Sequence, residues 1–270
     1  MRLENGRDSQ NVEDRRGAGG GFGRGRGGLA VGGGIGGVVL VVLALLFGVD
    51  PAVLTGGGQP GYAPPAIEGG GPPRTAQAPY ADGATRPTGD DPGARFVSRV
   101  LAETEDVWNP IFESLGRRYQ EPRLVLYSGV VQSGCGTAQA QVGPFYCPAD
   151  QRAYIDLDFL AQLQRQLGAP GDFAAAYVIA HEVGHHVQQQ LGILGRVEQL
   201  KRQASEVEAN ALQVRVELQA DCLAGFWARR AHEQRRILEQ GDIEEGLNAA
   251  AAVGDDRLQR RARGTVQPES

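Results

Sequence analysis

The sequence predicts an α+β domain in which one helix is followed by a small sheet and then by a mostly helical chain. Three observations support this fold class: an amphipathic stretch near residue 95, short strand-like runs separated by glycines over residues 123–157, and long segments of helical periodicity beyond residue 172. The chain has 270 residues and a formal net charge of −5. This mildly acidic balance gives no electrostatic footprint for nucleic acid.

The N-terminal third is not expected to pack into this domain. Nine of the 15 prolines lie between residues 51 and 92, and glycine is dense from residue 17 to residue 93. Such a composition cannot bury enough apolar surface to offset the entropy of ordering the chain. We therefore predict a Gly/Pro-rich linker over residues 50–93 and a globular domain over residues 94–270.

An apolar stretch over residues 29–49 contains neither charge nor proline. About 20 such residues are long enough for a bilayer-spanning helix, so we predict one uncleaved transmembrane helix, with a signal-peptide core as the alternative. The arginines that precede the stretch are Arg15, Arg16, Arg24 and Arg26. The positive-inside rule then predicts a cytoplasmic Gly/Arg-rich tail over residues 1–28 and a catalytic domain on the extracytoplasmic side of the cell membrane.

The first half of the domain shows one helix and several strands. Apolar residues recur at helical spacing over residues 95–115, where Asn109-Pro110 is a candidate break. A short strand is predicted at residues 123–127, and a second at 154–157, at the end of a glycine-studded stretch. A helix is expected to follow over residues 156–167.

The second half of the domain is predicted to be helical. Asp172 is a candidate N-cap for a helix over residues 173–191, which ends at a glycine. After a polar connection, a second helix is predicted over residues 205–238, and Asp242 opens a last short helix.

The first of these two helices contains the pentapeptide H-E-x-x-H, formed by His181, Glu182 and His185. Residues four apart lie one turn above each other, so both imidazoles can bind one ion. Glu182 projects to the side of that face, from where it can take a proton from a metal-activated water and pass it to the leaving amine. The pattern predicts a catalytic Zn²⁺ site with Glu182 as the catalyst.

A catalytic zinc site needs a third protein ligand and one open position. The metzincin extension of the motif is absent, because its glycine and histidine positions hold Gln188 and Leu191. The later helix offers Glu217 and, one turn further, Asp221 on the same face. We therefore predict that Glu217 binds the metal and that Asp221 accepts the free N–H of His181 or His185.

Other residues have weaker claims to the site, and the pentapeptide alone also occurs by chance. Glu206 and Glu208 are rival third ligands, but they lack an acidic partner four residues on and fit a solvated helix face. His186 is rotated away from the metal face. His232 lies among arginines at a polar helix end and is interpreted as a surface residue.

The three cysteines fit an oxidising compartment. Cys135 and Cys147 are 12 positions apart across a turn-rich stretch, so a disulfide is the leading interpretation and zinc binding by the pair the lesser one. Cys222 is left over.

Long motifs resemble the bacterial neutral zinc metallopeptidase family: AYVIAHEVGHHVQQQLG, VRVELQADCLAGFWA and GDIEEGLNAAAAVGDDRLQ. The resemblance covers roughly residues 95–260. It implies a zincin-like fold, a membrane-tethered or secreted location, and His181, His185 and Glu217 as zinc ligands with Glu182 as the catalyst. Family members usually continue beyond the last motif into a segment with a His-Gly pair and a late Cys. The C-terminus is therefore expected to be truncated, which puts activity in question more than zinc binding.

The leading functional hypothesis is a membrane-anchored zinc peptidase that acts on peptides or proteins outside the cytoplasm. The alternative is an inactive zinc-stabilised scaffold or interaction module. A third hypothesis, an RNA-associated protein that uses the basic residues 15–28, is weaker because a basic flank beside a membrane helix explains the same residues.

Overall fold

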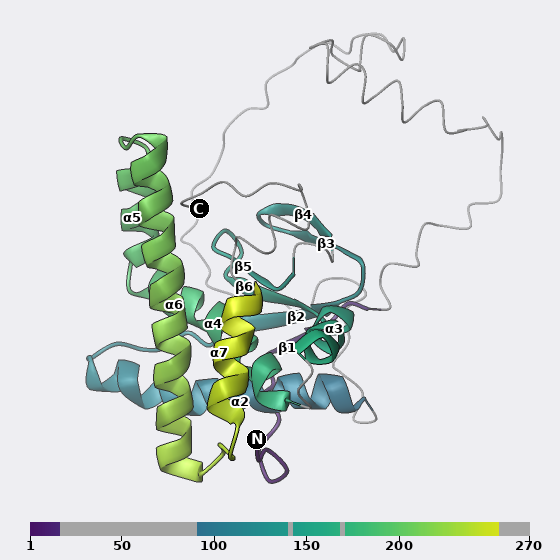
Figure 1. The fold of residues 1–270 in the computed structure, drawn as a ribbon. Helices are drawn as coiled ribbons and strands as arrows, with labels where there is room; N and C mark the ends of the chain where they lie inside the picture. The colour runs from purple at the N-terminus through teal and green to yellow at the C-terminus, as the bar shows by residue number, and fades with distance from the viewer. Residues whose placement is uncertain (17–90, 140–142, 168–170, 254–270) are drawn as a thin grey trace, which may run out of the picture. The chain divides into compact units, whose positions relative to one another are not determined.

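The computed structural model describes residues 1–16, 91–139, 143–167 and 171–253 (Figure 1). Its strands are β1 (Val12–Asp14), β2 (Arg123–Tyr127), β3 (Val130–Ser133), β4 (Gly136–Gln139), β5 (Phe145–Cys147) and β6 (Arg152–Asp156). Its helices are α2 (Pro92–Ser114), α3 (Leu157–Leu167), α4 (Asp172–Gln190), α5 (Ile193–Lys201), α6 (Glu206–Arg235) and α7 (Asp242–Val253). The predicted α+β class, with a small sheet and a helical C-terminal part, is confirmed.

The main sheet has four strands in the order β1-β2-β6-β5, and β3 and β4 form a separate antiparallel hairpin. β1, β2 and β6 are parallel, whereas β5 runs antiparallel to β6 at the edge. Each face of the two central strands packs into a different apolar cluster. Leu124 and Ile155 point toward the helices, while Val125 and Tyr154 point toward Val131 of the hairpin. A sheet buried on both faces explains why β2 reads as a continuous apolar run.

Helix α4 is the central helix of the domain. It contacts α2, α3, α5, α6 and α7, as well as strands β5 and β6. Small residues such as Ala174, Ala176 and Ala180 line it and are buried, so neighbouring helices can approach it closely. The H-E-x-x-H segment therefore lies on a helix that is held by neighbouring elements on several sides.

Two expectations about helices needed correction. α2 continues through Pro110 without a break, since this proline lies on the exposed side of the helix and the carbonyl it leaves unbonded can be hydrated. The polar connection after α4 contains a further helix, α5, in which no residue is fully buried. Its few apolar residues gave no clear amphipathic pattern.

The first 16 residues belong to the same unit as helices α2–α7. β1 pairs in parallel with β2, and the backbone N–H of Leu124 donates to the carbonyl of Asn11 at 2.9 Å. Arg16 forms an ion pair with Asp91 at 2.5 Å. A cytoplasmic tail was expected over residues 1–28. The described part of that segment, residues 1–16, is instead packed against the domain. A three-residue strand surrounded by charged residues carries too little periodicity to be recognised in the sequence.

The transmembrane part of the fold prediction is corrected. The span expected over residues 29–49 lies outside the described residues, as does the linker over residues 50–90. Within the ranges that the structure describes, no helix combines the length and apolar character needed to cross a bilayer.

Replacing Asn11 with Ala tests whether the N-terminal segment is docked. The Asn11 amide donates to Glu105 at 2.9 Å and to Glu121 at 2.8 Å, and Glu105 is buried. Because hydrogen bonds to carboxylates are lost, we expect the free energy of unfolding to fall by about 2 kcal/mol in a denaturant titration. Asn5→Ala, at an exposed position, is the control and should change it by less than about 0.5 kcal/mol. Equal effects of the two variants would show that β1 is not docked.

Candidate metal centre

Helices α4 and α6 carry the residues of the H-E-x-x-H segment and of the E-x-x-x-D pair, and they pack closely. Gly184 makes this approach possible, because a Cβ atom there would lie 3.0 Å from the carbonyl oxygen of Ala220. Real Cβ atoms are rarely that close to a neighbour, so a larger residue would push the two helices apart. The glycine inside the motif therefore fixes the distance at which the carboxylates of α6 face the histidines of α4.

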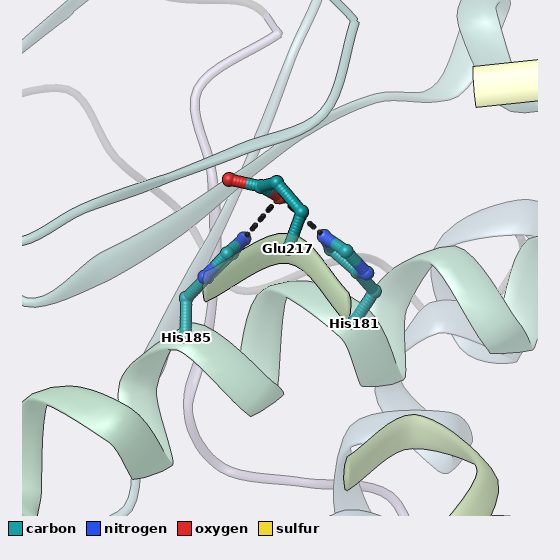
Figure 2. A group of neighbouring side chains, drawn as sticks. All are labelled: His181, His185 and Glu217. Atoms are coloured by element: carbon teal, nitrogen blue, oxygen red, sulfur yellow. Dashed lines mark hydrogen bonds and ion pairs between the residues drawn. The ribbon is translucent and has the colours of Figure 1, made fainter. Parts of the chain in front are cut away.

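The three predicted ligands converge on one point. Figure 2 shows His181 and His185 on successive turns of α4, with the Glu217 carboxylate from α6 between them. Glu217 Oε2 lies 3.3 Å from Nε2 of each histidine. One ligand atom from each residue lies within 4.8 Å of the other two.

This spacing fits a zinc ion. Ligand atoms bound tetrahedrally to zinc at about 2.0–2.1 Å are about 3.3 Å apart, which matches the separation of the carboxylate oxygen from each imidazole nitrogen. Two imidazoles and one carboxylate are also a donor set typical of catalytic zinc, and three protein ligands leave one position for water. The residues present therefore fit the metal that the sequence predicts.

Each histidine has a second partner at its other ring nitrogen. His181 Nδ1 lies 2.8 Å from Asp221 Oδ1, the contact that an orienting role of Asp221 requires. The hydroxyl of Tyr177 also donates to Asp221. His185 Nδ1 lies 2.9 Å from the side-chain oxygen of Gln188. Neither the Tyr177 contact nor the Gln188 contact was predicted from the sequence.

Without metal, the site is a tightly coupled group of charges. Burial opposes charge on His181, but hydrogen bonds with Asp221 and Glu217 raise its pKa to about 10. Burial likewise opposes charge on His185, and the hydrogen bond with Glu217 raises its pKa. Burial alone would raise the pKa of Glu217, but both histidines hold it well below its usual range. Zinc must displace protons from these imidazoles, so its affinity should rise with pH.

Glu182 is buried beside the ligands, with a 6% exposed side chain. Burial raises its pKa, and the charges of His181 and His185 only partly counter that effect. The backbone of Tyr146 in β5 lowers the pKa of Glu182 by a smaller amount. A carboxylate with a raised pKa is a stronger base than an exposed one and suits proton transfer near neutral pH.

His186 points away from the ligands and is almost completely buried. Its Nε2 donates to the carbonyl oxygen of Gln120 at 2.6 Å, so Nδ1 is left to accept the hydroxyl proton of Tyr146 at 3.0 Å. Burial lowers the pKa of His186 to about 4. A neutral His186 thus anchors the side chain of Tyr146. The sequence showed only that this histidine is off the metal face.

The burial of His186 predicts acid sensitivity of the fold. Because its pKa falls from 6.5 in the unfolded chain to about 4 in the folded one, the unfolded chain binds more protons between these values. Stability is complete above pH 6.5 and falls by about 3 kcal/mol as the pH drops to 4. We expect urea unfolding of the zinc-free protein to show this loss of stability. In the variant His186→Gln, the loss between pH 6.5 and pH 4 should be smaller by about 3 kcal/mol. An identical pH dependence in both proteins would contradict this role.

The remaining candidates are placed elsewhere. Glu208 is exposed and forms a capping box with Ser205 at the start of α6, so it is not a ligand of this site. His232 Nδ1 accepts the backbone N–H of Leu238 at 3.1 Å. Asp172 begins α4 without capping it, and its side chain binds the amino group of Met1.

The predicted disulfide between Cys135 and Cys147 is present. It joins the turn of the β3–β4 hairpin to the end of β5, next to Tyr146. Cys222 is a free, exposed cysteine.

Comparison with known proteins identifies the family. Residues 1–270 match the family described as "Putative neutral zinc metallopeptidase". The chain belongs to this family. A zinc metallopeptidase family implies Zn²⁺ as the cofactor, and hydrolysis of peptide bonds as the type of activity, in agreement with the donor set at the converging histidines.

The curated relatives that the chain matches are described as uncharacterized proteins. The chain is 46% identical over 272 aligned residues to uncharacterized protein YpfJ of Escherichia coli K12, covering all of this chain and 89% of YpfJ. It is 42% identical over 240 residues to uncharacterized protein Rv2575 of Mycobacterium tuberculosis and to Mb2605 of Mycobacterium bovis, covering 84% of this chain and 75% of each relative. No solved structure matches the chain.

Proposed function

We propose that the chain is a zinc-dependent peptidase in which His181, His185 and Glu217 hold the ion and Glu182 is the general base. The observation that carries this proposal is the position of the Glu217 carboxylate, 3.3 Å from both imidazole Nε2 atoms, with a buried carboxylate of raised pKa beside them. When bound, Zn²⁺ lowers the pKa of a coordinated water and polarises the peptide carbonyl.

The protein's own residues supply the proton transfers. Glu182 takes the proton of the attacking water and then gives it to the amine that leaves when the C–N bond breaks. Asp221 holds His181 with Nε2 facing Glu217, so the ligands are oriented before the metal arrives.

We also propose that the domain acts outside the cytoplasm on peptide or protein substrates. The disulfide between Cys135 and Cys147 supports an oxidising compartment, since structural disulfides are rare in reducing cytosol. The acidic balance of the chain supports a substrate other than nucleic acid.

Measurement of zinc content together with the turnover of a mixed peptide library tests the proposal. The chain should bind one zinc ion per molecule and cleave peptides, and both properties should disappear when a chelator removes the metal. A protein that is loaded with zinc yet leaves every peptide intact would instead be the scaffold that the sequence allowed as the alternative. A protein that binds no zinc would contradict both functions.

A further inference from the structure

We infer that Gln188 is a positioning residue of the metal centre: its amide fixes the tautomer of His185 and ties the helix that carries Glu217 to α4. This inference rests on the proposed zinc site and deepens it. Gln188 occupies the position at which the metzincin pattern has glycine, and no sequence rule assigned it a role. Its side chain is completely buried between α4 and α6.

The hydrogen bonds of Gln188 determine the orientation of its amide. Nε2 lies 2.8 Å from the carbonyl oxygen of Val216, and this oxygen can only accept. The nitrogen end of the amide must therefore point to α6, where Nε2 also donates to Gln219 Oε1 at 3.0 Å. The oxygen end is consequently left to face His185.

This orientation fixes the proton on His185. The Gln188 oxygen lies 2.9 Å from His185 Nδ1 and can only accept, so Nδ1 must carry a hydrogen. The neutral imidazole then has its lone pair on Nε2, the atom that lies 3.3 Å from Glu217. Gln188 thus orients His185 through a neutral amide, as Asp221 orients His181 through a carboxylate.

The same side chain joins the two helices that supply the ligands. Gln188 follows His185 by one turn on α4, and Val216 immediately precedes Glu217 on α6. Movement of α6 along α4 would therefore break the hydrogen bond from Gln188 to the Val216 carbonyl and at the same time displace the Glu217 carboxylate. An apolar residue at position 188 would leave the His185 N–H and the Val216 carbonyl buried without these partners.

The test is a zinc-competition titration of the full chain against a chromophoric chelator, with Gln188→Met as the variant. Methionine has a similar volume and no amide. We expect zinc affinity to fall about 10- to 100-fold, as is typical when the partner of a metal-bound histidine is removed. Gln189→Met is the matched control on the same helix, at a half-buried position, and should leave the affinity unchanged.

A double-mutant cycle separates positioning from simple packing. If Gln188 acts through His185, adding Gln188→Met to His185→Ala should weaken zinc binding much less than it does in the wild-type chain. Fully additive losses, or an unchanged affinity in the single variant, would overturn the inference. Failure of the wild-type chain to bind zinc would instead overturn the proposed function, so the two failures are distinguishable.

If Gln188→Met does not fold, nuclear magnetic resonance of the zinc-loaded wild-type chain decides the question. The ¹⁵N-labelled His185 ring should carry a slowly exchanging proton on Nδ1 and bind the metal through Nε2. A ring that is protonated on Nε2, or one whose Nδ1 proton exchanges freely with solvent, would overturn the inference.

Discussion

Replacing Glu182 with Gln is expected to lower peptide turnover by about 10²- to 10⁴-fold, the range typical of a lost general acid–base residue. The amide has nearly the same shape but cannot accept the proton of the attacking water. Because Glu182 is adjacent to the ligands and not among the three converging groups, zinc affinity should remain close to that of the wild type. Steady-state kinetics on a cleaved peptide, with metal analysis of the same sample, measures both properties.

Glu121→Gln is a suitable control for this substitution. Glu121 lies away from the ligands and is exposed, with its carboxylate bonded to Asn11 and Asn109. The substitution Glu121→Gln makes the same chemical change outside the site, so peptide turnover should be unaffected. Unchanged turnover in the Glu182 variant would remove this residue from the mechanism, even if zinc is bound.

Replacing Glu217 with Ala is expected to weaken zinc binding by more than about 100-fold, because loss of an outer partner alone typically costs 10- to 100-fold. Glu217 is the only carboxylate that the described residues bring to both Nε2 atoms. Its removal also leaves two buried imidazoles whose charge is no longer compensated. Competition with a chelator gives the affinity, and circular dichroism shows whether the helices remain.

The matched control is Glu206→Ala, at the exposed N-terminal end of the same helix. Glu206 was a rival ligand in the sequence and has no place near the histidines in the structure. We expect its removal to leave zinc affinity unchanged. The opposite ranking of the two variants would mean that the helix presents a different residue to the metal.

Much of the site could be predicted because it depends on local spacing. His181 and His185 are four residues apart on a helix with apolar neighbours, and Glu217 and Asp221 repeat that interval on a later helix. Strand β2 has its predicted bounds because four consecutive strand-forming residues stand between Arg123 and Ser128. Helical and strand periodicities are properties of short windows, and the sequence displays them directly.

The rest depends on contacts between distant segments. Gln188 is one of several glutamines in its helix, and only the position of Val216 shows that its amide orients His185. His186 gains its role from Gln120 and Tyr146, which lie on other elements. β1 is recognisable only once β2 is in place to pair with it.

The most direct test of the central claim is X-ray absorption at the zinc edge of the metal-loaded chain, compared with that of Glu217→Ala. The proposed site should give a first shell of two imidazole nitrogens and oxygen ligands at about 2.0–2.1 Å, with one oxygen lost in the variant. A zinc ion with sulfur in its first shell, or a spectrum identical in the two proteins, would show that Glu217 and the two histidines are not the ligands.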